Sequence, residues 1–257
     1  MNRIQKPSLK YELNNIPIQD LSLEELSFFG KRQLSDGTEP IQIITFNLDF
    51  LKTAAENDGF KNICTNGSLV VADGFGITSL IRMKYHKKIE RITGHHFFYE
   101  LIKLSRKQEI KIALLGSSKF VQEKVIQKIT NEFPDCKIVS ALSPPLNFEV
   151  DKKVNEEVIR KLEKAQPDIL FVALGSPRQE IWINHYKYII GAKINMGIGS
   201  VLDYYSGYKK RAPQFMQQIG MEWFWRMISE PKRLARRYLL NDLPFYFKTI
   251  KKIYSEK

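Results

Sequence analysis

The chain has 257 residues, of which 43% are hydrophobic and 26% are charged, so it can bury the core of one large domain, with or without an appendage. No segment approaches the roughly 18 consecutive apolar residues of a membrane-spanning helix, and the N-terminus lacks the apolar run of a signal peptide, which predicts a cytoplasmic protein. The two cysteines, Cys64 and Cys136, have no metal-ligand spacing and are expected to be buried thiols.

The formal net charge of +12 is unevenly distributed. Residues 209–257 contain 12 lysines and arginines but only 4 acidic residues, so most of the excess lies in the last fifth of the chain. A basic segment of this kind favours an acidic partner, which could be a nucleic acid, an anionic membrane surface or an acidic substrate.

The first 72 residues lead from a polar segment into strong strand patterns. Residues 1–40 are expected to form a peripheral lead-in, with one short helix over Ser22 to Phe29 between two turns, Pro17 to Asp20 and Leu34 to Gly37. Apolar runs then predict three strands separated by one helix: strand Ile41 to Phe46, helix Leu48 to Asn57, strand Asn62 to Thr65 and strand Leu69 to Ala72.

Polar side chains follow two of these strands. Thr45 and Asn47 lie at the end of the first strand, and Asp73 follows the third. In an open α/β sheet, ligands bind beyond the carboxyl ends of the strands, so these three residues are candidates for chemistry. Asp73 precedes Gly74, however, and a helix cap or an Asx turn would explain it equally well.

Helices and strands alternate through residues 77–196, which predicts a doubly wound, mostly parallel α/β sheet. The expected helices are Ile77 to Tyr85, His95 to Lys107, Lys119 to Asn131 and Glu149 to Ala165, and the expected strands are Ile110 to Leu115, Lys137 to Ala141, Asp168 to Leu174 and Ala192 to Met196. His95 and His96 are adjacent, so we expect them to point in different directions rather than form a ligand pair. No GxGxxG sequence follows a strand, which argues against a dinucleotide enzyme.

A polar turn, Gly175 to Glu180, joins the strand ending at Leu174 to a helix. Ser176 is expected to cap that helix, and Pro177 suits its first turn. Such a junction is a ready anion site, where Arg178 and Gln179 could hold a phosphate or a sugar. An ordinary turn with a solvated arginine is the alternative.

After Tyr208 the pattern changes to basic helices, which divides the chain into an α/β core (1–208) and a C-terminal appendage (209–257). The expected helices are Gln214 to Ser229, one that begins at Pro231, and Leu239 to Tyr254. The last of these mixes aromatic residues with lysines, a combination typical of helices that lie on a membrane surface. A helical cap that packs on the sheet is the alternative.

Several short motifs together point to a known family. They occur in the order Ala72-Asp73-Gly74, Arg91-Ile92-Thr93-Gly94, Leu174 to Glu180, Gly197-Ile198-Gly199, Arg211-Ala212-Pro213, Glu222 to Arg226 and Glu230 to Arg233. In this order and spacing, the chain resembles the WecG/TagA/CpsF glycosyltransferases from about Ile41 to Tyr238. The resemblance implies a Rossmann-like core with a C-terminal membrane-associating appendage, and homo-oligomers are consistent with the family.

The resemblance also implies an activity and a set of site residues. The activity is inverting transfer of a sugar from a UDP-sugar to a polyprenyl-diphosphate-linked sugar at the cytoplasmic face of a bacterial membrane, in cell-surface polysaccharide synthesis. Asp73 is the implied general base. The implied substrate-binding residues are Thr45, Asn47, Arg91 and Gln179 in the core and Arg226, Arg233 and Arg236 in the appendage.

The chemistry suits these residue types. A carboxylate can take the proton from the attacking hydroxyl, and arginines can stabilise charge on the departing diphosphate without a metal. No DxD-type metal motif is present, and Asp203 and Glu222 are expected to be structural. We therefore expect no cofactor and no nucleic-acid partner, and the donor sugar stays open between N-acetylmannosamine, its uronic acid and glucose. The alternative is a non-catalytic basic protein that binds nucleic acid or anionic membrane.

Overall fold

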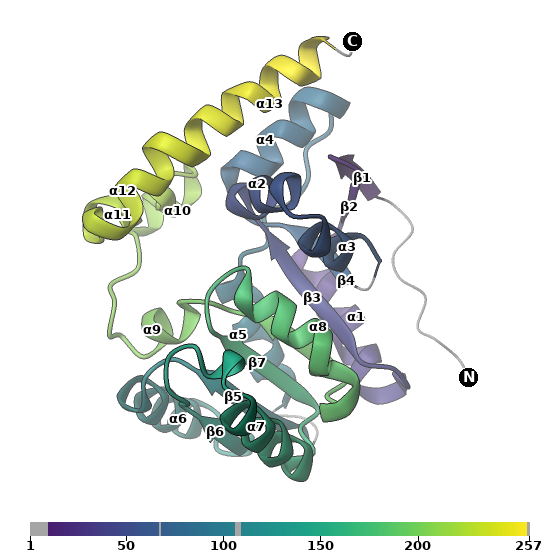
Figure 1. The fold of residues 1–257 in the computed structure, drawn as a ribbon, viewed down its shortest axis with the longest axis vertical. Coiled ribbons are helices and arrows are strands. Elements are labelled where there is room, and N and C mark those ends of the chain that lie inside the picture. Colours follow the sequence, from purple (N-terminus) through teal and green to yellow (C-terminus); the bar gives the residue numbers. More distant parts are fainter. Residues whose placement is uncertain (1–9, 67, 106–108, 256–257) are drawn as a thin grey trace.

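The computed structural model describes residues 10–66, 68–105 and 109–255, and it has an eight-stranded sheet at its centre (Figure 1). The strand order is β1-β2-β4-β3-β8-β7-β5-β6, and only the β1–β2 pair is antiparallel. The strands are β1 Lys10–Leu13, β2 Ile16–Gln19, β3 Ile41–Phe46, β4 Ser68–Ala72, β5 Lys111–Gly116, β6 Lys137–Leu142, β7 Ile169–Ala173 and β8 Ile194–Gly197. This confirms the predicted α/β class with a mostly parallel sheet.

Helices cover both faces of the sheet, because alternate residues of each strand are buried on opposite sides. Ile43 packs with one set of helices and Ile44 with the other. The first face carries α1 Leu23–Asp36, α5 Gly94–Ser105, α6 Lys119–Glu132 and α9 Val201–Tyr205. The second carries α2 Leu48–Glu56, α3 Asp58–Asn66, α4 Gly74–Tyr85, α7 Lys152–Ala165 and α8 Arg178–Ile190.

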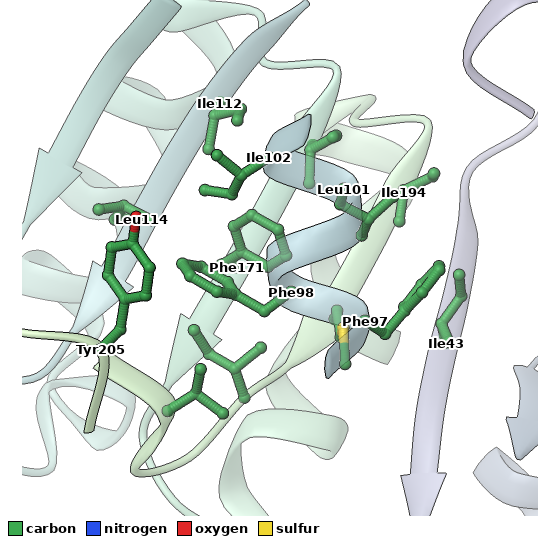
Figure 2. Packing of buried hydrophobic residues seen from close by; sticks show 14 of the residues in the cluster. Ile43, Phe97, Phe98, Leu101, Ile102, Ile112, Leu114, Phe171, Ile194 and Tyr205 are labelled. Carbon is green, nitrogen blue, oxygen red and sulfur yellow. The ribbon is translucent and has the colours of Figure 1, made fainter. Parts of the chain in front are cut away.

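Helix α5 lies at the centre of the first face. Figure 2 shows Phe97 and Phe98 projecting from α5 toward the strands, with Phe98 beside Phe171 of β7. The rings of Phe98 and Phe171 are 4.7 Å apart between centroids, and all three phenylalanines are fully buried. This packing anchors α5, whose first residue, Gly94, lies at the candidate site described below.

The N-terminal region is more regular than the sequence pattern predicts. Pro17 lies in β2, opposite Glu12 of β1, so the predicted turn over Pro17 to Asp20 is wrong. The predicted helix begins as expected, because Ser22 and Glu25 form a capping box, but it continues to Asp36. Its buried residues, Leu26, Phe29, Gly30, Gln33 and Leu34, recur at helical spacing through the predicted second turn.

One predicted strand is a helix. Asn62 to Thr65 lie within α3, whose buried residues Phe60, Ile63 and Cys64 have the i, i+3, i+4 spacing of a helix face. The side chain of Asn57 accepts a hydrogen bond from the Phe60 backbone N–H at 2.9 Å, as an N-cap residue does. A four-residue segment with two apolar residues was too short to distinguish the two structures.

The C-terminal residues form a chain of helices outside the sheet: α10 Gln214–Gln218, α11 Glu222–Ser229, α12 Pro231–Arg236, a π-helical turn η2 Arg237–Asp242, and α13 Leu243–Ser255. The single helix predicted over Gln214 to Ser229 is interrupted because Gly220 has φ +78°, outside the helical region. Figure 1 shows α13 running alongside α4. Among the described residues, no helix is both long enough and apolar enough to cross a bilayer.

Several contacts attach this segment to the core, and Ile253 of α13 is buried in the apolar cluster of the second face. Tyr246 of α13 hydrogen-bonds to Ser79 of α4 at 2.7 Å between oxygens, and Arg237 forms an ion pair with Asp49 of α2 at 3.5 Å. Lys209 Nζ lies 3.2 Å from Asp203 of α9 and 3.2 Å from Glu230. The last helix, α13, therefore packs on helix α4 rather than on the sheet that the cap alternative named.

Candidate active site

Asp73 lies at the carboxyl edge of the sheet, immediately after β4. Its backbone N–H donates to the Phe46 carbonyl at the end of neighbouring β3 at 2.8 Å, which fixes its position beside that strand. It occupies the N-cap position of α4, yet its side chain makes no capping hydrogen bond. The helix-cap interpretation of Asp73 therefore does not account for its carboxylate, which is left available for chemistry.

The surroundings of Asp73 raise the pKa of its carboxyl to about 7, from an ordinary 3.8. Burial is the largest cause, and the negative charge of Glu222 adds to it. Arg91, Arg226 and a hydrogen bond from the Gly94 backbone act in the opposite direction. A carboxylate with a pKa near neutral can both accept and release a proton at physiological pH.

Thr45 and Asn47 lie close to Asp73 along the same edge. Thr45 is buried, and its hydroxyl is 3.3 Å from the place where a side chain on Gly94 would begin, so only glycine fits there without displacing it. Asn47 caps α2 through its Oδ1, which accepts from Phe50 N–H at 3.2 Å.

Arg91 connects the core to the C-terminal segment. Its Nη2 donates to the Gln217 carbonyl at 2.9 Å, and its Nη1 lies 3.7 Å from Glu222. Glu222 also lies 3.7 Å from Arg211 Nε. The expected structural role of Glu222 is consistent with these pairs, but its charge also acts on Asp73, which the sequence did not reveal.

Of the three appendage arginines implied by the resemblance, Arg226 is the one whose charge acts on Asp73. Its Nε atom is buried and has no hydrogen-bond partner, so it is free to bind a ligand group. Arg233 is exposed and forms an ion pair with Glu230 at 2.9 Å, and Arg236 is exposed on the same helix, α12. The structure thus brings Asp73, Arg91 and Arg226 together and leaves Arg233 and Arg236 outside this group.

The turn after β7 differs from the anion site that its sequence suggested. Arg178 forms an ion pair with Glu149, so the alternative of a freely solvated arginine is wrong. Pro177 occupies the N-cap position of α8, and Ser176 makes no capping hydrogen bond, so the predicted cap is wrong. Gln179 is buried, and its side-chain oxygen accepts from the backbone N–H groups of Gly175 and Gly199.

A cavity of about 470 Å³ lies between α5, α6 and α9, and Arg211 is one of the residues that line it. Both His95 and His96 are among the residues that line it. Burial, followed by the charges of Arg211, His96 and Lys128, lowers the pKa of His95 to about 4. Within the described ranges, no three or more His, Cys, Asp or Glu side chains are placed to hold a metal ion.

Comparison with known proteins gives a consistent result. The sequence profile of the "Glycosyl transferase WecG/TagA/CpsF family" matches residues 11–257. A Bacillus subtilis (strain 168) protein is 29% identical over 240 residues, which cover 93% of this chain and 90% of the relative. A Staphylococcus aureus (strain MRSA252) protein is 27% identical, covering 85% of this chain and 82% of the relative. Both are named N-acetylglucosaminyldiphosphoundecaprenol N-acetyl-beta-D-mannosaminyltransferase.

Proposed function

Because the chain belongs to the glycosyl transferase WecG/TagA/CpsF family, we propose that it transfers N-acetylmannosamine from UDP to a polyprenyl-diphosphate-linked N-acetylglucosamine. The names of the Bacillus subtilis and Staphylococcus aureus relatives support the sugar and the lipid-linked acceptor. Addition of a sugar to such a lipid is a step in building a cell-surface polysaccharide.

The observation that carries this proposal is the state of Asp73. Its carboxylate makes no capping hydrogen bond, has a pKa of about 7, and is subject to the charges of Arg91 and Arg226. A base for this reaction must be near neutral in pKa and close to cations that stabilise a departing diphosphate.

The proposed reaction is a single displacement with inversion. The acceptor hydroxyl attacks the anomeric carbon of the donor sugar while the bond from that carbon to the UDP oxygen breaks. Asp73 receives the hydroxyl proton as the new glycosidic bond forms. Negative charge accumulates on the UDP diphosphate, where Arg91 and Arg226 stabilise it, and we expect the reaction to proceed without a metal. Thr45 and Asn47 border the same space and would orient the sugar.

We also propose that the appendage holds the enzyme on the anionic inner face of the cell membrane. Large apolar side chains of this segment are exposed, and they occur among its basic residues: Phe215, Ile219, Ile228, Leu239, Leu240 and Phe247. An apolar surface with surrounding lysines and arginines binds anionic bilayers through both burial and charge. The lipid-linked acceptor would then be reached without leaving the membrane.

UDP release from a panel of UDP-sugars tests the activity, measured with and without a short-chain polyprenyl-diphosphate-N-acetylglucosamine and in the presence of EDTA. We expect acceptor-dependent release from UDP-N-acetylmannosamine. Release from the uronic acid or glucose donor instead would correct the sugar, and activity abolished by EDTA would overturn the metal-free mechanism. If the folded protein binds none of the UDP-sugars, the proposed transferase activity is rejected. A mobility-shift assay with RNA and DNA tests the predicted lack of a nucleic-acid partner. Sedimentation tests whether the protein is a homo-oligomer.

A further inference from the structure

Two adjacent buried side chains, Gln179 and Glu180, connect the loops that follow β7 and β8. Gln179 Oε1 accepts hydrogen bonds from Gly175 N–H at 3.1 Å and from Gly199 N–H at 3.0 Å. Gln179 Nε2 donates to Glu180 Oε1 at 2.7 Å. We call this pair of residues the loop clip.

The orientation of the Gln179 amide is determined by its partners. Two backbone N–H groups can only donate, so they must face the amide oxygen, and the NH₂ group must then face an acceptor. The Glu180 carboxylate supplies that acceptor in a buried place. Glu180 is itself fixed, because its backbone carbonyl accepts from Gln42 Nε2 of β3 at 3.0 Å.

The clip also explains one glycine of the Gly197-Ile198-Gly199 motif. A Cβ on Gly197 would lie 2.4 Å from Glu180 Oε1 and 2.6 Å from Gln179 Nε2, closer than atoms can approach. Gly197 therefore makes room for the clip itself. Burial is the largest cause that raises the pKa of Glu180, to about 7, so this carboxylate is held in a place that does not favour its charge.

The second loop leads to Asp73 through helix α9. After Gly199 the chain enters α9, where Tyr205 packs against Phe98 of α5 at 5.4 Å between ring centroids. Gly94 is the first residue of α5, and its backbone hydrogen-bonds to the Asp73 carboxylate. A change in the loop after β8 would therefore reach the group that holds Asp73 through the packing of α9 on α5.

From this geometry we propose that Glu180 is a positioning residue: it orients the Gln179 amide, which fixes the loops after β7 and β8 at the edge of the candidate active site. Gln179 then acts by holding backbone rather than by touching substrate. The effect on turnover rests on the proposed transferase activity, whereas the effect on the two loops does not.

Exchange of the two functional groups tests the proposal with variants of nearly identical shape. Gln179→Glu would place a second carboxylate oxygen against Glu180, whereas the double variant Gln179→Glu/Glu180→Gln restores a donor–acceptor pair with the roles reversed. Glu180→Gln alone can keep its oxygen toward Gln179 and serves as the conservative control. Glu180→Met removes the acceptor at similar volume.

Amide hydrogen exchange at Gly175 and Gly199 gives a readout that does not need activity. We expect Gln179→Glu and Glu180→Met to exchange about 10- to 100-fold faster at both sites, the range expected when a buried polar group loses its partner. The double variant and Glu180→Gln should stay within about threefold of the parent. Protection unchanged in both Gln179→Glu and Glu180→Met would overturn the proposal.

Turnover of the same variants completes the test. We expect kcat to fall about 10- to 100-fold in Gln179→Glu with little change in the donor KM, and to recover in the double variant. Recovery of protection without recovery of kcat would overturn the positioning role. If the parent protein transfers no sugar, the proposed function fails, while the exchange measurements still decide whether the clip fixes the loops.

Discussion

The candidate site has two halves that are held in very different ways. Asp73, Thr45 and Gly94 belong to the sheet edge, where the adjoining strands β3 and β4 and helix α5 are densely buried. Arg226 belongs to α11, and neither α10 nor α11 has a buried residue. The proposed base thus lies in densely packed core, and one of its cationic partners lies on a helix that is joined to the core through polar contacts of Arg91. We infer that docking of α10 and α11 on the core decides whether the site is complete.

The largest expected effect is on the core half. Asp73→Asn should lower acceptor-dependent UDP release by about 100- to 10,000-fold, because the variant lacks the base that receives the acceptor proton. Activity close to that of the parent would show that the base lies elsewhere. It would also overturn the assignment of the chemistry to the core half. The loss should be seen at saturating concentrations of both substrates, as a fall in kcat.

The same variant should be more stable than its parent at alkaline pH. The Asp73 carboxyl has a raised pKa of about 7 in the folded protein and an ordinary value of 3.8 in the unfolded chain. Between these values the unfolded chain has lost a proton that the folded protein keeps, so the parent loses stability as pH rises from about 4 to about 7. Asparagine does not titrate, so the Tm of Asp73→Asn relative to that of the parent should be higher at pH 8 than at pH 5. The opposite order would contradict the raised pKa.

The next largest effect tests the appendage half. Arg226→Met should lower kcat about 100-fold, because the variant lacks the half-buried cation proposed to stabilise the leaving diphosphate. Since Arg226 lowers the pKa of Asp73, its removal should also move the acidic limb of the pH–rate profile to higher pH. Lys232→Met, at an exposed position on α12, is the matched control and should change neither quantity. An unchanged pH profile in Arg226→Met would show that the appendage half does not influence the pKa of Asp73.

A smaller effect is expected on membrane binding. The double variant Leu240→Glu/Phe247→Glu should bind vesicles of anionic lipid about tenfold more weakly, because two apolar side chains can no longer enter the bilayer. Leu146→Glu is the control. Leu146 is an apolar residue outside the appendage that is 84% exposed, and its replacement should leave membrane binding unchanged. Equal loss in both proteins would mean that the appendage has no special role in membrane binding.

The smallest effect concerns the attachment of the appendage. Tyr246→Phe removes the hydrogen bond to Ser79, which should increase the detached fraction about two- to tenfold. Trypsin cleavage at Lys209 and Lys210, in the connection between core and appendage, would report detachment. Tyr188→Phe, at an exposed position of α8, is the control. No change in cleavage rate would show that the other contacts suffice.

The sequence was most informative where a single local pattern decides the structure. Continuous apolar runs identified β3, β5 and β7, and the rule that ligands bind at strand ends selected Asp73, Thr45 and Asn47 before any coordinates were known. Local patterns failed where two structures share one pattern, as in α3, or where one residue such as Gly220 interrupts a helix. The bridging position of Glu222 and the contact of Gln179 with Gly199 depend on residues far apart in the chain, so no local pattern could predict them.

Lys209 gives the molecule a property that its helices and strands do not. This one ammonium group pairs with Asp203 of the core and Glu230 of the appendage, and its side chain keeps 29% of its surface in solvent. Dissolved ions therefore reach the ammonium group. Its ion-pair interactions weaken as ionic strength rises toward the physiological range, where the screening length is about 8 Å. Lys209 therefore joins core and appendage through an ionic bridge whose strength falls as salt is added.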